Sequence, residues 1–288
     1  MKGAVVVIDA ADRAGRGVVE AALLATRPIV AVSNDTVELA RLRGDSSRLD
    51  LETVRGSIAN ESQSARLAGA LRDLGRPIDG IVIASCGSPL SGRVLDHSVA
   101  AFQQRLEADL VPQLAAARSL LPLLTCGGRT GSYIVIGSPG AEHPWAGYSY
   151  CSIASAAKNM LVRVLHEEAR ALDVRVQLLA VKKPIRAVEN GDRAGDDWPE
   201  AIAIGEQALS LIDRAEPRTA NEAVVPFTPH LPSRTSQPAE KVTTSLAQIA
   251  RSTLLEAEEL ERDEQSVLDQ TRRAIKPILD STQKTRGN

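Results

Sequence analysis

Short runs of aliphatic residues alternate with amphipathic stretches along most of the chain. Continuous runs of Val, Ile, Leu and Ala are typical of strands that a parallel sheet buries on both faces. They predict strands at residues 4–8, 29–32, 51–56, 81–85, 133–136, 174–181 and 223–228. Apolar residues at helical spacing predict helices at residues 15–26, 37–43, 62–74, 99–124, 152–172 and 198–212. This alternation indicates right-handed crossovers and a doubly wound, mainly parallel α/β sheet.

The pattern changes after residue 228. Prolines with Ser and Thr between them mark a linker, and they stand at Pro226, Pro229, Pro232 and Pro238. Apolar residues return at roughly helical spacing from residue 239 to about residue 275. We therefore expect an α/β domain over residues 1–228, a Pro-rich linker over 229–238 and a C-terminal helical extension over 239–288.

Composition narrows the functional classes. Aromatic residues make up 2% of the chain and apolar residues 43%, so the core must consist of Ala, Val, Leu and Ile. The formal net charge of -2 gives no reason to expect nucleic acid or an anionic membrane as a partner. The chain starts directly in a strand and has no apolar stretch of membrane-spanning length, so we expect a cytoplasmic protein. Three cysteines without CxxC spacing suggest neither disulfides nor a metal site.

Two segments carry candidate chemistry. Ala-Ala-Asp-Arg-Ala-Gly-Arg-Gly at residues 10–17 follows the first predicted strand and contains Gly15 and Gly17. Alone, such a glycine pair is explained by a tight turn between a strand and a helix. Gly-Ser-Tyr-Ile-Val-Ile-Gly-Ser at residues 131–138 contains the strand predicted at residues 133–136 and places Ser138 two residues after it. Tyr150 follows twelve residues later, just before a long predicted helix.

The order of these segments resembles the short-chain dehydrogenase/reductase family over about residues 1–228. In that family the first strand leads to a TGxxxGxG loop, where backbone N–H groups bind the cofactor pyrophosphate. A serine follows the fifth strand, and the next helix carries a YxxxK pair. The resemblance implies a Rossmann-like sheet and a nicotinamide cofactor. It also implies catalytic positions for Ser138 and Tyr150, and for Asp109 where the family has an asparagine.

The cofactor positions depart from the family pattern. Ala11 replaces the first glycine of the loop, and Ser57 replaces the aspartate that contacts adenine. Asn34 stands where a charged residue usually recognises the ribose, and Gly87 is what remains of the NNAG motif after the fourth strand. The vestigial cofactor-binding residues are therefore Gly15, Gly17, Asn34 and Gly87. We expect no cofactor to be bound.

The catalytic positions depart as well, because Ala154 stands where the family has its lysine. A tyrosine with its ordinary pKa of about 10 is a poor general acid near neutrality without a cation beside it. Lys158 lies one further turn along the helix, but no register restores the Tyr–Lys pair. We interpret Tyr150 as a partly buried core tyrosine whose hydroxyl hydrogen-bonds to Ser138. Asp109, Ser138 and Tyr150 would then be vestigial catalytic residues.

A second possibility for Ser138 is nucleophilic catalysis with His143, which Glu142 would have to orient. Cys86 and Cys151 are interpreted as small core residues.

Two classes of function remain. The first is a catalytically degenerate reductase-fold subunit, a pseudoenzyme that assembles with itself or with an active ketoreductase of the same family. The resemblance implies that the long helices at residues 99–124 and 152–172 form the assembly surface, and both are rich in Ala and Leu. The extension beyond Pro238 would pack on a partner or a neighbouring subunit. The alternative is an active carbonyl or ketoacyl reductase that uses NADP or NAD with a non-standard active site.

Overall fold

The computed structural model describes residues 2–45, 50–85, 91–125, 130–186, 195–214 and 222–229. Gly87, Cys86, the linker beyond residue 229 and the helical extension lie outside these residues. Within the described part, no helix is both long enough and apolar enough to cross a membrane.

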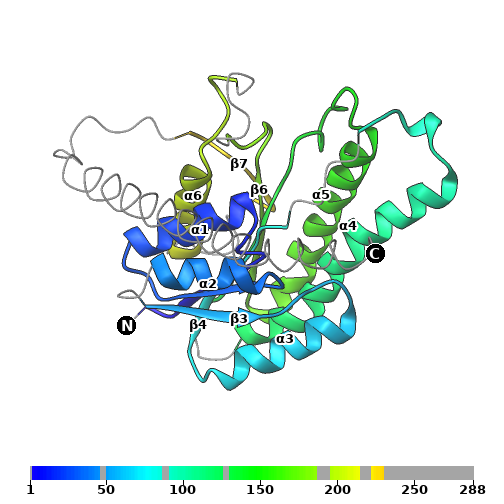
Figure 1. Ribbon diagram of the computed structural model, residues 1–288. Helices are drawn as coiled ribbons and strands as arrows, with labels where there is room; N and C mark the ends of the chain where they lie inside the picture. The colour runs from blue at the N-terminus through cyan, green and yellow to red at the C-terminus, as the bar shows by residue number, and fades with distance from the viewer. Residues whose placement is uncertain are drawn as a thin grey trace, which may run out of the picture. The chain divides into compact units, whose positions relative to one another are not determined.

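A parallel sheet of seven strands forms the centre of the described domain (Figure 1). The strands are β1 (Ala4–Ile8), β2 (Ile29–Ser33), β3 (Leu51–Arg55), β4 (Ile78–Ile83), β5 (Ser132–Ile136), β6 (Arg175–Ala180) and β7 (Val224–Pro226). Their order is β3-β2-β1-β4-β5-β6-β7, so β1 lies inside the sheet and the order reverses between β1 and β4. The prediction of a doubly wound, Rossmann-like α/β fold is confirmed.

Helices cover both faces of the sheet, as Figure 1 shows. The helices are α1 (Arg13–Leu24), α2 (Thr36–Asp45), α3 (Glu61–Asp73), α4 (Val99–Leu120), α5 (Ser149–Ala169) and α6 (Ala201–Asp213). Apolar residues of α1, α2 and α6 pack on one face with Val5 and Val7 of β1. Those of α3, α4 and α5 pack on the other face with Val6 and Ile8. Every β1 side chain is therefore buried, which explains the uninterrupted aliphatic run in the sequence.

Among the strands, the boundaries of β4 differ most from the sequence prediction. The strand runs from Ile78 to Ile83 rather than over residues 81–85. The start of the strand does not appear in a hydrophobicity pattern because it contains the charged residue Asp79. This carboxylate is accommodated in the strand because it accepts hydrogen bonds from the Gly3 amide (2.6 Å) and from Arg27 (3.0 Å). Arg27 is 5% exposed and also donates to Asp213 of α6 at 2.6 Å. This buried guanidinium therefore ties α6 to the amino-terminal ends of β1 and β4.

Close contact between α1 and α6 requires glycine on both helices. A Cβ atom on Gly17 would collide with the Ala201 carbonyl oxygen, and one on Gly205 would collide with the Gly17 carbonyl oxygen. Gly15 is equally constrained, because a Cβ there would collide with the backbone of Asp9. The packing of α1 thus accounts for both glycines of the first loop without a bound phosphate.

We predict that Gly205→Ala destabilises the domain by about 1–3 kcal/mol, because the added methyl group meets backbone that has no room to move. Gly69→Ala is the matched control in α3, where nothing lies within 4 Å of a new Cβ. It should stabilise the domain by roughly 0.5–1 kcal/mol through helix propensity. Urea unfolding followed by circular dichroism measures both variants. Equal midpoints for the two would contradict the packing explanation.

Candidate functional site

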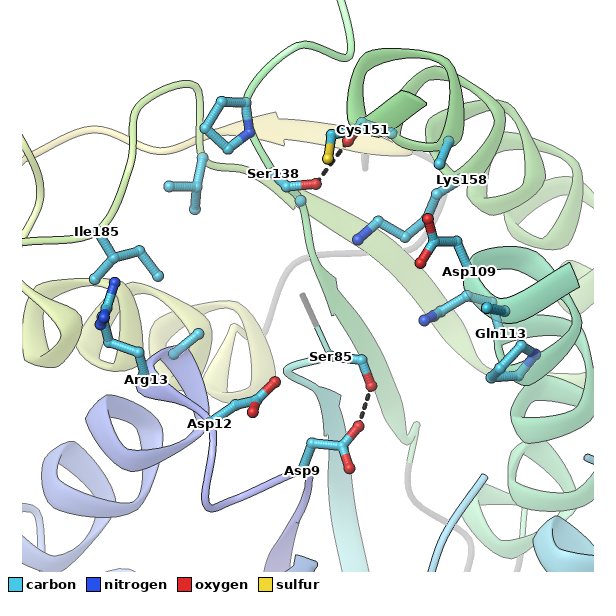
Figure 2. A pocket seen from close by; sticks show the side chains of 18 of the residues that line it. Asp9, Asp12, Arg13, Ser85, Asp109, Gln113, Ser138, Cys151, Lys158 and Ile185 are labelled. Atoms are coloured by element: carbon cyan, nitrogen blue, oxygen red, sulfur yellow. Dashed lines mark hydrogen bonds between the residues drawn. The ribbon is translucent and has the colours of Figure 1, made fainter. Parts of the chain in front are cut away.

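A cavity of about 540 Å³ opens at the carboxyl ends of the central strands (Figure 2). Asp9, Ser85, Ser138 and Val181, which follow β1, β4, β5 and β6, all line it. Side chains from α4 and α5 form one wall, and the segment after β6, including Ile185, forms another. In open α/β sheets, ligands bind outside the carboxyl ends of the strands, where the strand order reverses. This cavity is therefore the candidate site.

The rotation of α5 brings a different pair of residues to Ser138 than the sequence alignment predicts. Ser138 Oγ lies 2.8 Å from Ser155 Oγ, and the two hydroxyls share a hydrogen bond. Cys151 lies one turn before Ser155 and lines the cavity beside it. Residues four apart share a helix face, so the pair facing Ser138 is Cys151 and Ser155. Cys151 is half-buried at the cavity, and its interpretation as a plain core residue is incomplete.

Tyr150 does not belong to the set of residues that line this cavity. Its side chain is 1% exposed and packs against His97 and Phe102, with ring centroids 5.0 Å and 5.7 Å away. Its hydroxyl meets no hydrogen-bond partner among the described residues. The expected bond between this hydroxyl and Ser138 is therefore not formed, because Ser138 bonds to Ser155 instead. Ala154, the predicted lysine position, does line the cavity.

A lysine is nevertheless present in the cavity. Lys158 is 7% exposed, lines the cavity, and donates a long hydrogen bond of 3.4 Å to the Ile136 carbonyl oxygen. It lies one turn beyond Ser155 on the same face of α5. The sequence alone assigns Lys158 no role, because no helical register that includes Tyr150 brings it to the lysine position. The spacing from Cys151 through Ser155 to Lys158 is the signal that would have found it.

Helix α4 contributes a polar stripe to the opposite wall. Asp109 lines the cavity as predicted, and its carboxylate accepts a hydrogen bond from Arg105 Nε at 2.7 Å. Gln113 lies one turn further on, is 5% exposed, and lines the cavity. Its Oε1 has no hydrogen-bond partner among the described residues. Sequence reasoning missed Arg105 and Gln113, although their spacing of four on either side of Asp109 places all three on one helix face.

At the other end of the cavity, two carboxylates lie near the amino terminus of α1. Asp9 has a left-handed backbone (φ 57°) and hydrogen-bonds through its carboxylate to Ser85. Burial raises the pKa of Asp9 above its ordinary value, although the hydrogen bond from Ser85 opposes this shift. Asp12 lines the same end of the cavity, at the position just before α1 (Figure 2). In the family's nucleotide loop this helix terminus receives a pyrophosphate, which two carboxylates would repel.

Asn34, the residue predicted to stand at the ribose-recognising position, is also absent from the cavity. Its side chain is exposed. Its neighbour Asp35 accepts hydrogen bonds from the Val37 and Glu38 amides at 3.0 Å each, and so caps α2. Gly15 and Gly17 serve packing and do not line the cavity, whereas Ser57 does line it. The residues at these positions differ from those with which the family binds a nicotinamide dinucleotide, although Arg13 lines the cavity beside Asp12.

The nucleophilic alternative lacks its orienting group. The Glu142 carboxylate accepts a hydrogen bond from Lys182 at 2.7 Å, which lowers the pKa of Glu142. His143 is exposed, and the hydroxyl of Ser138 is already bonded to Ser155. The described residues therefore contain no Ser–His–Glu arrangement at Ser138.

Fold and cavity together define a Rossmann-type protein of the dehydrogenase/reductase class. A family model described as enoyl-(acyl carrier protein) reductase matches residues 14–209. The chain therefore belongs to this family of short-chain dehydrogenases/reductases, which typically bind NAD(P)H. No curated protein sequence matches the chain.

Solved structures of the same class show the same fold. An oxidoreductase of the short-chain dehydrogenase/reductase family from Burkholderia thailandensis is 21% identical, with a TM-score of 0.68 over 79% of this chain and 91% of that one. A short-chain type dehydrogenase/reductase from Mycobacterium ulcerans is 17% identical, with a TM-score of 0.70 over 78% and 88%. The NADPH-bound short chain oxidoreductase from Pseudomonas aeruginosa PAO1, described as containing an atypical catalytic center, is 17% identical, with a TM-score of 0.68 over 82% and 98%.

We predict that Asp9→Asn stabilises the protein at neutral pH relative to the wild type. The raised pKa means that the folded state disfavours the charged carboxylate, so its contribution is most favourable below the ordinary pKa of 3.8 and is lost as pH rises through the raised value. The advantage of the variant should therefore grow from acidic to neutral pH. Thermal unfolding between pH 3.5 and 8 measures it.

Asp173→Asn is the matched control, because Asp173 also has a left-handed backbone (φ 62°). Asparagine tolerates this conformation well, so any gain that comes from the backbone conformation alone should appear in both variants. A pH-independent gain at Asp9 would show that burial of its charge plays no part.

Proposed function

We propose that this chain is a catalytically degenerate subunit of the reductase fold, which performs no nicotinamide-dependent redox chemistry alone and acts through assembly. The observation that carries the proposal is the α5 face opposite Ser138, which presents Cys151 and Ser155. In the family, the residues four apart on this face are the proton-donating tyrosine and the lysine that lowers its pKa. Neither Ser155, which faces Ser138, nor Ala154, which is aligned with the lysine, carries a charge with which to do this.

The end of the cavity near the amino terminus of α1, where the family binds its cofactor, supports the same proposal. Asp9 and Asp12 put carboxyl groups beside Arg13 where a pyrophosphate would lie, and Asn34 is exposed and does not line the cavity. Each missing charge-assisted hydrogen bond weakens binding by about 1.5–3 kcal/mol, so several together remove decades of affinity. Under this proposal the chain holds neither NAD nor NADP.

Assembly would use α4 and α5, which pack against each other and expose apolar side chains. The exposed residues on these helices include Val111, Leu114, Ile153, Met160 and Val164. Exposed apolar side chains gathered on neighbouring elements are typical of protein–protein contacts. The proposed partner is a second copy of this chain or an active family member that presents the corresponding helices.

The second candidate function is an active reductase with a non-standard site, and Lys158 favours it. This buried ammonium lies in the cavity together with Ser138, one turn away from the family's lysine position. The similar Pseudomonas protein was described with both NADPH and an atypical catalytic center. If this candidate holds, NADP or NAD binds and Lys158 supplies the positive charge.

The two candidates predict opposite outcomes in a calorimetric titration with NAD, NADH, NADP and NADPH. We expect no binding tighter than millimolar, and no oxidation of NADPH with carbonyl substrates. An active family reductase under the same conditions is the positive control. A dissociation constant in the low micromolar range would make the active reductase the leading function.

Assembly predicts that Met160→Arg dissociates the oligomer without unfolding the domain. Met160 is 60% exposed on α5, so an arginine there places charge in the apolar contact at no cost to the core. Ala157→Arg, on the same helix face, should act alike. Ala40→Arg, at an exposed alanine of α2 on the other side of the sheet, is the matched control and should leave the oligomer intact.

Multi-angle light scattering at micromolar concentration decides the question. The assembly proposal fails if the wild-type chain is a monomer both alone and when mixed with any reductase encoded beside it.

A further inference from the structure

The cavity keeps a polar end that neither the family's redox chemistry nor the proposed assembly uses. Lys158 is 7% exposed, yet its ammonium group makes one hydrogen bond of 3.4 Å within the described part of the chain. An ammonium group has three donors, and a buried charge without full compensation is costly. Proteins retain such a group where a ligand completes its interactions.

No carboxylate of the described residues forms an ion pair with Lys158. The nearest candidate on the wall of the cavity is Asp109, and its carboxylate is engaged by Arg105 at 2.7 Å. Figure 2 shows Lys158 and Asp109 facing the same space from α5 and α4. Lys158 and Arg105 together with Asp109 leave one net positive charge at this end of the cavity. The site is therefore matched to a ligand with one negative charge.

Neutral hydrogen-bonding groups surround this charge. Gln113 is 5% exposed and lines the cavity. Its Nε2 amide is the group that could donate to an anion, whereas its Oε1, which has no partner among the described residues, is an acceptor and needs a donor. The hydroxyls of Ser138 and Ser155 satisfy each other through one hydrogen bond and keep capacity for another. A planar group with two oxygen atoms could accept hydrogen bonds from the lysine and from these neutral donors together.

The wall on the other side of the cavity is mainly apolar, and its lysine, Lys183, is paired with Asp197. Val181, Pro184 and Ile185 from the segment after β6 line it, and Figure 2 shows Ile185 across the cavity from Lys158. A ligand for this site therefore has one anionic end and an apolar body. A phosphate ester carries more negative charge and would also approach Asp9 and Asp12 at the far end.

We propose that the cavity binds a small organic acid with one carboxylate group, which lies against Lys158, Gln113 and the serine pair, while its apolar part lies along Val181 to Ile185. This inference rests on the proposed function, because it needs the cavity to be free of nicotinamide cofactor. It makes the subunit a sensor or carrier of a small carboxylate.

The test uses the full-length protein in a buffer without carboxylate or phosphate, and hexanoate as the probe. Calorimetry should give a dissociation constant of millimolar or tighter for hexanoate, and binding at least about 10-fold weaker for hexanamide, which has the same shape without the charge. Inorganic phosphate should not compete. Equal binding of the acid and the amide, or no binding of hexanoate, overturns the proposal.

The variants locate the site. Lys158→Met should weaken hexanoate binding at least about 10-fold, and Gln113→Leu roughly fivefold. Lys2→Met removes an exposed lysine far from the cavity and should change nothing. Lys158→Met should also raise the unfolding temperature of the ligand-free protein, because it removes a poorly compensated buried charge, whereas loss of a structural lysine would lower it. Unchanged hexanoate binding in Lys158→Met overturns the proposal.

Cofactor binding and hexanoate binding distinguish the pseudoenzyme proposal from the carboxylate site. Micromolar binding of NADPH contradicts the pseudoenzyme whatever hexanoate does. Absence of hexanoate binding without any cofactor binding overturns the carboxylate site and leaves the assembly proposal standing.

Discussion

The rotation of α5 about its axis determines which side chains reach the cavity, and it is set by packing along the whole helix. Val162, Leu165 and Ala169 are buried in the core beside β5 and β6, and at the other end of the helix Ser155 hydrogen-bonds to Ser138. Successive residues of a helix are about 100° apart, so a shift of one residue replaces every group that faces the cavity. With the observed rotation Cys151 faces the cavity, and the neighbouring Tyr150 is buried against other side chains.

This rotation also explains why Ser138, at a catalytic position of the family, shares the cavity with Lys158 and Gln113, which have no role in the family's chemistry. The side chains that would move protons in a reductase are replaced at the face opposite Ser138, while Lys158 and Gln113 bring unused hydrogen-bonding capacity to the same space. At the other end of the cavity, Asp9 and Asp12 add two carboxyl groups beside Arg13, where a dinucleotide would lie. Under the proposed function the fold would serve as a scaffold whose ligand preference has changed, because function resides in the site rather than in the fold.

The glycines of the first loop show how a family motif can persist for a different physical reason. Gly15 and Gly17 are required by the close approach of α1 to β1 and α6, where a Cβ would collide with backbone. Their presence therefore carries no information about phosphate binding. Arg27 is a comparable case, because this buried arginine holds α6 to two strands through Asp79 and Asp213, and hydrophobicity alone gives no sign of it.

The sequence by itself determined the sheet, because strands buried on both faces must be aliphatic throughout, and such runs are visible without knowledge of their partners. It also determined that Ser138 follows a central strand and that Asp109 lies on the long helix before it. Tertiary structure decided the rest of the site. A spacing of four residues shows which side chains share a helix face, but which face meets the cavity depends on how the helix packs. Tyr150 is buried and Lys158 reaches the cavity because of that packing. The packing depends on contacts between distant segments, so it cannot be read from the sequence of the helix.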